Sequence, residues 1–418
     1  MILLALLLAA PHVFYVKAGR LFDGLSETYR QNVALRIEGD RIAAVGAAIP
    51  AGAEVIELPT VLPGLIDCHV HLQSRSDHFE DIWDFKESLP QHSMVAVIHA
   101  RRTLLAGFTT VRDVGSAPFL AVDLRKLIDE GYFPGPRIVA SGPGISITGG
   151  HGDLNNYAPN VSTRLFPEER GFRIADGADE IRHVVRAQVK YGVDVIKILA
   201  SGGVFSRGDT PGAPQYTLEE LKVAVEEAHK AGRRIAAHAH GAQSIKDATR
   251  AGVDSIEHGT LIDAEGIRLM KERGTFLDGD IYNDDFILAN AAALHIPEEY
   301  VAKERAIGQI QRDNWAKAVK AGVRITFGTD AGIFPHGDNA KQFAVMVRYG
   351  LPPARAILAA TASAAELLDR SKDVGTLQPG RYADLVAVTG DPLQDVRVLE
   401  NIPFVMKGGA VVKDELRR

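Results

Sequence analysis

The chain has 418 residues and a formal net charge of -6, and 46% of its residues are hydrophobic. This composition is typical of a globular protein with a large core, and without a basic stretch it argues against nucleic acid as a partner. The single cysteine, Cys68, excludes an intrachain disulfide, so cysteine usage does not indicate a redox compartment.

The chain begins with an apolar leader, which we place at residues 1–12. Residues 1–10 read MILLALLLAA, a run too short to span a bilayer but as long as the apolar core of a signal peptide. No Lys or Arg precedes the run and Pro11 follows its Ala pair, so an apolar arm packed on the body is the alternative. A signal peptide would predict a secreted or periplasmic protein, and its absence a cytoplasmic one. We expect no membrane span.

The regions near both chain ends share one pattern. Residues 13–62 and 372–415 contain short β-rich runs separated by turns, without a long helical pattern. The simplest arrangement is that both ends pair with each other. We therefore predict a small discontinuous β-sandwich domain made of residues 13–63 and 372–418.

Residues 64–371 alternate between β-rich runs and helical patterns. In the clearest helix, Thr217 and Glu220 form a capping box and Gly232 marks the end. Alternation of this kind predicts an α/β fold, and eight strands favour a closed (β/α)8 TIM barrel over an open doubly wound sheet, the alternative. The eight predicted strands are 65–71, 108–113, 137–142, 193–199, 234–240, 254–258, 275–281 and 324–330.

Metal-binding residue types follow the predicted strands. His69 and His71 close the first strand, and residues i and i+2 of a strand point to the same face. A lone His-x-His is a weak signal, because two polar residues at a barrel mouth would give the same pattern. His238 and His240 end the fifth strand, His258 the sixth and Asp330 the eighth. Active sites of such barrels lie at these strand ends, and the mixture of nitrogen and oxygen donors suits zinc or another divalent metal.

Lys197 lies in the middle of the fourth predicted strand and is expected to face the barrel interior. A buried, unpaired ammonium is unfavourable, so its pKa shifts or it finds a partner. One interpretation is a lysine that reaches the mouth or pairs with a carboxylate. The other is a neutral lysine carboxylated by CO2, whose anionic carbamate bridges two metals.

These segments together resemble the amidohydrolase superfamily. The matching pieces are GLIDCHVHL (64–72), Lys197, AAHAHG (236–241), SIEHGT (255–260), FGTDAG (327–332) and the return segment 375–393. The resemblance implies two divalent metals, with zinc as the expected ion. It assigns His69, His71 and Asp330 to the first metal, His238 and His258 to the second, and carboxylated Lys197 to the bridge.

Within the superfamily, SGPGISITGGHGD (141–153) is similar to the imidazolonepropionase-like branch. That branch includes Xaa-Pro dipeptidases and bacterial ochratoxin A-hydrolysing amidohydrolases, and the resemblance implies that His151 contacts substrate. Imidazolonepropionases proper use one metal and lack the bridging lysine, so Lys197 favours the peptidase-like members. One departure is Asp369, which stands where the superfamily usually has glycine.

The two-metal site, an arginine in the loop after the fourth strand and the resemblance to this branch together predict hydrolysis of an amide or peptide bond to an amino acid with a free carboxylate, as in a carboxypeptidase or dipeptidase. The resemblance makes ochratoxin A one candidate substrate. Two metals would activate a water, and Asp330 would act as general base and then general acid. His151, His240 and Tyr282 are candidates to stabilise the oxyanion or hold the substrate, although each could be an ordinary polar lining residue.

The long segment 201–216 follows the fourth strand and is rich in Gly and Pro. We interpret it as a substrate loop in which Phe205, Arg207 and Tyr216 contact the substrate, with Arg207 suited to a carboxylate. A solvated connection is the alternative.

Other functions are compatible with parts of this pattern. They are a cyclic-amide hydrolase or heterocycle deaminase on the same site, and a metal-free barrel that only binds. The last is disfavoured because all six ligand positions are present. The expected partner is a small or dipeptide-like substrate, and we expect a homo-oligomer.

Overall fold

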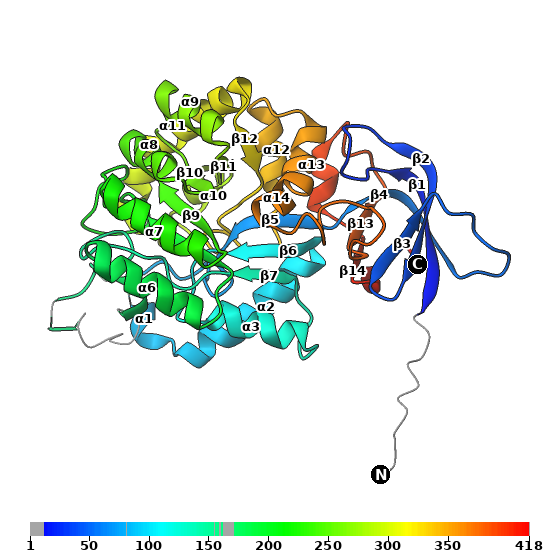
Figure 1. Cartoon of the computed structure of the whole chain (residues 1–418), viewed down its shortest axis with the longest axis horizontal. Helices are drawn as coiled ribbons and strands as arrows, with labels where there is room; N and C mark the ends of the chain where they lie inside the picture. Colours follow the sequence, from blue (N-terminus) through cyan, green and yellow to red (C-terminus); the bar gives the residue numbers. More distant parts are fainter. Residues whose placement is uncertain (1–11, 81, 154, 159, 162–170, 418) are drawn as a thin grey trace, which may run out of the picture.

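The computed structural model describes residues 12–80, 82–153, 155–158, 160–161 and 171–417. The predicted leader therefore lies outside the described residues, apart from His12, and its interpretation as a signal peptide stays a prediction. Figure 1 shows a large body in which helices surround parallel strands, and beside it a sheet that contains segments from both ends of the chain. The predicted mixed α/β class is confirmed.

All eight predicted strands of the central region are present, and their pairing is parallel. They form a three-stranded sheet in the order β5-β6-β7 and a five-stranded sheet in the order β12-β11-β10-β9-β8. Isolated bridges link both edges of the two sheets, Ile145 with Ile198 and Val70 with Ala331. The bounds are β5 Leu65–Val70, β6 Phe108–Asp113, β7 Arg137–Ala140, β8 Val195–Leu199, β9 Arg234–Ala239, β10 Ser255–His258, β11 Phe276–Asp278 and β12 Arg324–Thr326.

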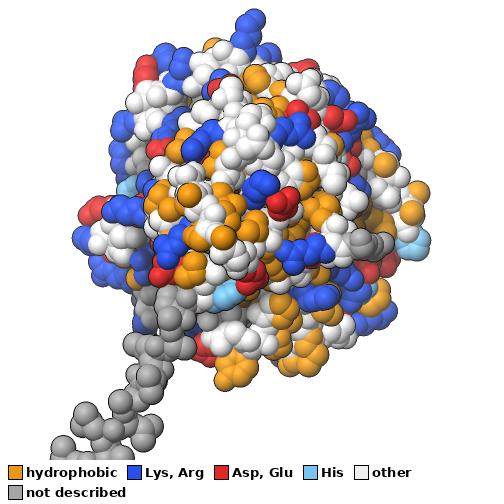
Figure 2. Space-filling model, turned by 90° about the vertical axis from the view of Figure 1, so that its right-hand side faces the viewer, with side chains coloured by type: hydrophobic (Ala, Val, Ile, Leu, Met, Phe, Trp, Pro, Cys, Tyr) orange, Lys and Arg blue, Asp and Glu red, His pale blue; other side chains and the backbone are white. Residues whose placement is uncertain are grey.

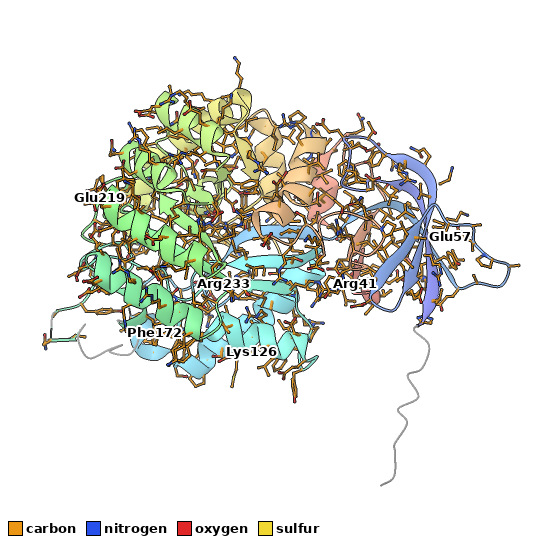
Figure 3. All side chains as sticks on the ribbon, viewed as in Figure 1. Arg41, Glu57, Lys126, Phe172, Glu219 and Arg233 are labelled. Carbon is orange, nitrogen blue, oxygen red and sulfur yellow. The ribbon has the colours of Figure 1, made fainter. Side chains whose placement is uncertain are left out.

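The helices bury one stripe each against these strands. In α7, the predicted capping box between Thr217 and Glu220 is present, and Leu221 and Val225 are among its buried residues. Glu219 on α7 and Lys126 on α3 lie on the outer side (Figure 3). The helices are α1 Trp83–Lys86, α2 Leu89–Leu105, α3 Leu120–Asp129, α6 Ala178–Lys190, α7 Leu218–Lys230, α8 Ala242–Ala251, α9 Ala264–Arg273, α10 Asn283–Asn290, α11 Glu298–Ala321, α12 Lys341–Arg348, α13 Pro353–Ala359 and α14 Ala362–Leu367.

Both chain ends contribute to one seven-stranded sheet, here called the end sheet, with the order β15-β14-β13-β4-β1-β2-β3. Two stacked layers of a sandwich are not distinguished in this strand order, and the predicted domain boundaries stay a prediction. The end sheet has an apolar core of its own, to which Phe14, Leu35, Leu385 and Phe404 belong. Its strands are β1 Val13–Leu21, β2 Arg30–Glu38, β3 Arg41–Val45, β4 Val55–Pro63, β13 Leu385–Val388, β14 Phe404–Lys407 and β15 Ala410–Asp414, and a 3-10 helix, η1 Val396–Glu400, precedes β14.

Strand β4 of the end sheet leads directly into β5 of the body at Gly64. A Cβ atom at this position would stand 2.1 Å from the Oγ1 atom of Thr109 on β6. The close approach of β6 to the junction between β4 and β5 therefore requires glycine. Figure 2 shows that basic and acidic side chains are interspersed over the face on the end-sheet side. Within the described part of the chain, none of the helices combines the length and apolarity that a membrane span needs.

Candidate active site

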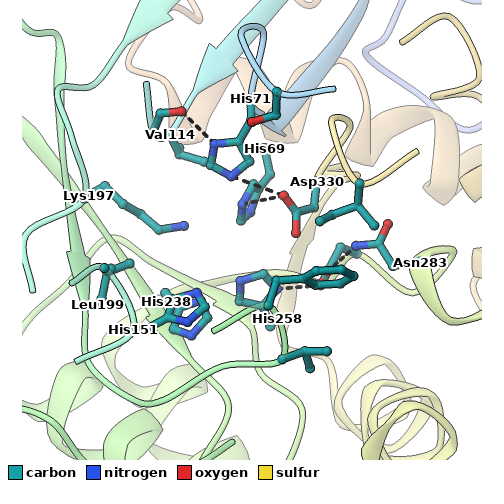
Figure 4. A pocket seen from close by; sticks show the side chains of 18 of the residues that line it. His69, His71, Val114, His151, Lys197, Leu199, His238, His258, Asn283 and Asp330 are labelled. Carbon is teal, nitrogen blue, oxygen red and sulfur yellow. Dashed lines mark hydrogen bonds and ion pairs between the residues drawn. The ribbon is translucent and has the colours of Figure 1, made fainter. Parts of the chain in front are cut away.

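A cavity of about 290 Å³ lies at the carboxyl ends of the parallel strands. Parallel strands point their last residues to one edge, which brings side chains from distant parts of the sequence together. Figure 4 shows the Lys197 amino group pointing into the middle of this site. All six predicted metal ligands line the cavity: His69, His71, Lys197, His238, His258 and Asp330.

The side chain of Asp330 faces the histidines of the first strand. Its Oδ1 atom lies 3.2 Å from the Nε2 atom of His71 and 3.6 Å from the Nε2 atom of His69. Burial alone would raise the pKa of Asp330, but the neighbouring His69 and His71 lower it below its usual range. This carboxylate is therefore ionised at neutral pH.

Two of the site histidines, His71 and His258, are held through hydrogen bonds at their Nδ1 atoms, and the Nδ1 atom of His69 lies close to a carboxylate without a hydrogen bond. The oxygen atoms are Glu257 Oε2 beside His69, the Gly115 carbonyl for His71 and Asp280 Oδ1 for His258, at 2.9, 2.8 and 2.9 Å. Carbonyl and carboxylate oxygens only accept hydrogen bonds, so the Nδ1 atoms of His71 and His258 carry the protons. Their Nε2 lone pairs then face the cavity, as metal-ligating histidines require.

The carboxylate behind His258 is itself fixed. Asp280 accepts hydrogen bonds from Asn283 Nδ2 at 2.7 Å and from Gln311 Nε2 at 3.0 Å. Burial would raise the pKa of Asp280, but the charge of His258 and its hydrogen bond lower it to about 2. A permanently ionised Asp280 therefore sets the orientation of the His258 ring.

Lys197 is 2% exposed on strand β8, and all five residues of the strand are buried. Among the described residues its amino group has no hydrogen bond and no ion-pair partner. Burial lowers the pKa of Lys197, and the charges of Glu257 and Asp330 only partly offset this effect. The neutral, nucleophilic amine is consequently favoured compared with an ordinary lysine.

The described residues fit a metal site. The Nε2 atom of His238 is buried without a hydrogen-bond partner, which is unfavourable unless a ligand fills the space in front of it. Two groups of side chains offer ligand atoms within 4.8 Å of one another, namely His238 with His240 and His258, and His69 with His258 and Asp330. Imidazole nitrogens and a carboxylate oxygen are the donors that zinc prefers.

The backbone at the site is strained at two of the predicted ligand positions. His258 has a φ of 67° and Asp330 a φ of 58°, values that residues other than glycine rarely adopt. Such strain costs on the order of 1–3 kcal/mol per residue and is found mainly where the surrounding structure enforces a functional geometry. These angles occur at the last residue of β10 and in the segment that follows β12, and both side chains line the cavity.

His151 and His240 also line the cavity, as predicted. The Nδ1 atom of His151 lies 2.8 Å from Ser206 Oγ, and Ser206 donates a hydrogen bond of 2.6 Å to Asp209. Because the Ser206 proton points to Asp209, the Nδ1 atom of His151 donates and its Nε2 atom is left for the cavity. Burial lowers the pKa of His151 to about 4.

The structure brings only part of the predicted substrate set into the cavity. Phe205 lines it, but Arg207 lies near the surface with its guanidinium 3.6 Å from Glu299. Tyr216 is buried and donates a hydrogen bond of 3.0 Å to the Ala175 carbonyl, and Tyr282 packs edge-on against Phe334 with ring centres 5.0 Å apart. Neither tyrosine is among the lining residues.

Sequence reasoning missed several cavity residues. Arg173 and Glu304 line the cavity, Asp280 holds one of its histidines, and Glu257 lies beside another. Glu257 could have been found, because a glutamate beside His258 in a buried strand requires a partner. Arg173 and Glu304 carry no such signal, because they lie outside the strand ends.

Comparison with known proteins agrees with this geometry. The profile of the Amidohydrolase family matches residues 60–412. Ochratoxinase of Aspergillus niger is 35% identical over 427 residues, covering 96% of this chain and 87% of the relative. A solved Xaa-Pro dipeptidase with methionine bound in its active site is 38% identical with a TM-score of 0.91, covering 96% of this chain and 100% of that one. The solved A. niger ochratoxinase is 32% identical with a TM-score of 0.86, covering 97% and 96%.

The chain therefore belongs to the amidohydrolase family, whose solved members of this kind have a TIM-barrel type of fold. It is a hydrolase that acts on carbon–nitrogen bonds. The resemblance predicted from the sequence motifs is confirmed.

Proposed function

We propose that this protein is a binuclear metal-dependent amidohydrolase that cleaves an amide or peptide bond to an amino acid with a free carboxylate. The observation that carries the proposal is Lys197, a 2% exposed lysine without a polar partner among the described residues, surrounded by five metal-ligand side chains. A buried ammonium without a hydrogen-bond partner is energetically unfavourable. A carbamate at the same position would be an anionic metal ligand.

Carboxylation joins the Lys197 Nζ atom to the carbon of CO2 and releases one proton. The product is an anion that offers two oxygen ligands. The lowered pKa of Lys197 supports this step, because only the neutral amine attacks CO2. In the proposed site His69, His71 and Asp330 would hold one metal, His238 and His258 would hold the other, and a carboxylated Lys197 would be a ligand to both.

Bound divalent ions, for which zinc is the expected element, supply a water of lowered pKa and polarise the scissile carbonyl. Asp330 takes the proton of the attacking water and delivers it to the leaving amine. Its lowered pKa keeps it ionised at the start of the reaction. His151 and His240 line the space around the carbonyl and are assigned to the oxyanion.

The walls of the cavity support an amino-acid derivative as substrate. Val204, Phe205 and Ile333 form apolar surface, whereas Arg173 adds a cation. We assign Arg173, in place of Arg207, to the substrate carboxylate. Ochratoxin A, in which an aromatic acyl group is joined to phenylalanine, satisfies this description, and so do apolar dipeptides. The names of the A. niger ochratoxinase and the Xaa-Pro dipeptidase support the same two substrate classes.

We also propose that the eight parallel strands of the body form a closed barrel. Bridges at both edges of the two parallel sheets support a closed eight-stranded barrel. A closed barrel directs all eight strand ends to one rim, which explains how ligands from five strands converge.

A substrate panel with metal analysis tests the function. The panel contains ochratoxin A, an N-acyl-phenylalanine, an Xaa-Pro dipeptide, the matching amides with a blocked carboxylate, and a cyclic imide. We expect two metals per chain and a loss of tenfold or more in kcat/KM when the carboxylate is blocked, since one charge-assisted contact is lost. Activity on the cyclic imide alone would move the enzyme to the cyclic-amide class.

The carbamate has its own test. Lys197→Ala should lose bound metal and most activity, and short carboxylic acids should restore part of both by replacing the carbamate. Two metals and full activity in Lys197→Ala would refute the bridging role.

A further inference from the structure

The carboxyl group of Glu304 is a feature that the proposed chemistry does not use. Glu304 lies on α11 and lines the cavity, yet it is only 5% exposed and has no hydrogen bond or ion pair among the described residues. Burial, together with the charges of Asp284 and Asp280, raises its pKa to about 8. A buried carboxyl without a partner is unfavourable in the free protein, and a ligand can supply the partner.

The helix leaves space for this carboxyl at Gly308, one turn further along. A Cβ atom at Gly308 would stand 3.0 Å from Glu304 Oε1 and 2.4 Å from Asp284 Oδ1. Two carboxyl groups therefore share the space above this glycine. Glycine lowers the stability of a helix interior. Its presence in the middle of α11 therefore indicates that the space beside it is needed for the two carboxyl groups.

Arg312, a cation on α11, contacts groups other than Glu304. Arg312 contacts Asp284 Oδ2 at 2.6 Å and Asp285 Oδ1 at 2.8 Å, and it donates a hydrogen bond of 3.1 Å to the Ile281 carbonyl. Its donors are thus directed to groups other than Glu304. The wall formed by α10 and α11 retains an acidic group that faces the cavity.

The surroundings of Glu304 indicate what it binds. Ile287 and Ile307 line the same cavity, so the carboxyl stands beside apolar surface where water competes poorly. A compact cation with three N–H groups would favour the ionised form of Glu304, which releases its proton to solvent when the cation binds.

We propose that Glu304 is a specificity-determining residue that binds a primary ammonium group of the substrate. This inference rests on the proposed amide-hydrolase function and favours, of its two substrate classes, dipeptides that carry an ammonium group over ochratoxin A, which has none. The ammonium has two possible sources, the free α-amine of a dipeptide or the side chain of a lysine residue. Arg173 in the same cavity makes a zwitterionic substrate a good electrostatic match.

Two matched substrate pairs separate the sources. Alanyl-phenylalanine and its N-acetyl form differ in the α-ammonium, while N-acetyl-alanyl-lysine and N-acetyl-alanyl-norleucine differ in the side-chain ammonium. Glu304→Gln keeps the shape of the side chain and removes its charge. Glu298→Gln, an exposed glutamate on the same helix, is the matched control.

In Glu304→Gln, we expect kcat/KM for the charged member of one pair to fall by about ten- to a hundredfold relative to its uncharged partner. The pair that responds identifies the source, and Glu298→Gln should change neither ratio. If both ratios in Glu304→Gln stay within twofold of wild type, the inference is wrong although the hydrolase function stands.

A binding measurement separates this inference from the proposed function. If the metal-loaded protein hydrolyses none of the four compounds, the proposed function fails. Calorimetric titration of the four compounds into metal-free protein then decides the subsite without turnover. Weaker binding of an ammonium-bearing member by Glu304→Gln supports the inference, and unchanged affinities overturn it.

Discussion

A buried carboxylate near the end sheet has hydrogen-bond partners, whereas, within the described part of the chain, two buried ionisable side chains in the active-site cavity have none. Near the end sheet, Asp384 is 4% exposed and accepts hydrogen bonds from Arg137 Nε at 3.0 Å and from the Gly408 amide at 2.6 Å. In the cavity, Lys197 and Glu304 are as deeply buried, but neither has a hydrogen-bond or ion-pair partner among the described residues.

This difference shows which region is arranged for stability and which for binding. A satisfied polar group stabilises the fold, whereas an unsatisfied one remains only where a ligand completes it. The strained positive φ angles of His258 and Asp330 also belong to the cavity, the region arranged for binding. Substitution of a predicted metal ligand should therefore affect activity more than stability, whereas substitution of a hydrogen-bonded group outside the cavity should affect stability more than activity.

The largest effect is expected for Asp330→Asn. The amide is a poorer metal ligand and cannot take up a proton, so kcat/KM should fall by about a thousandfold or more. The free energy of unfolding of the metal-free protein should change little. Steady-state kinetics and urea denaturation measure the two quantities.

Asp391→Asn is the matched control beside the end sheet. Asp391 pairs with Arg20 at 2.8 Å and accepts a hydrogen bond of 2.7 Å from Tyr29. Its substitution should cost about 1 kcal/mol of stability and leave kcat/KM unchanged. A comparable loss of activity in both variants would contradict the division between the two regions.

The second prediction concerns Arg112, which is buried beneath the cavity. It lies 2.8 Å from Glu257 and 3.0 Å from Asp278, and both carboxylates are fully buried. Arg112→Met leaves them without a counter-charge and should destabilise the metal-free protein by about 3–5 kcal/mol in urea denaturation. A loss below about 1 kcal/mol would show that the carboxylates take up protons instead.

The third prediction uses the pH dependence of stability. Because the pKa of Glu304 is raised from 4.5 to about 8, the folded protein holds this proton more tightly than the unfolded chain. The resulting stability is complete below pH 4.5 and is lost as the pH rises toward 8. At about 1.4 kcal/mol per pKa unit, the loss over this interval is about 4–5 kcal/mol.

Urea denaturation of metal-free Glu304→Gln at pH 4.5 and pH 8 checks this prediction, because the amide does not titrate. The variant should lose less stability than wild type over this interval. Parallel losses in both proteins would mean that Glu304 has a partner in solution.

The smallest effect is expected at Asp369, which follows α14 with a φ of 55°. Glycine adopts this conformation without strain, so Asp369→Gly should stabilise the protein by about 0.5–1 kcal/mol. The substitution lies outside the cavity and should leave kcat/KM unchanged. A decrease in the urea midpoint would show that the aspartate makes a compensating contact.

The sequence alone predicted the strands of the body and the six candidate ligand side chains that meet in the cavity. Hydrophobic runs of strand length predict all eight strands, and each metal-ligand histidine or aspartate stands at a strand end. The topology of parallel strands then implies a shared rim, so His69 and Asp330 can be brought together without coordinates. These features are local in sequence, or they follow from a general rule of the fold.

Only the tertiary structure decided which remaining side chains face the cavity. Tyr216 and Arg207 lie in the predicted substrate loop, but the loop directs one to the Ala175 carbonyl and the other toward Glu299. Glu304 and Arg173 reach the cavity from segments without a recognisable motif. The direction of a loop or helix side chain depends on packing against residues far away in sequence, whereas a strand end has its direction set by the barrel itself.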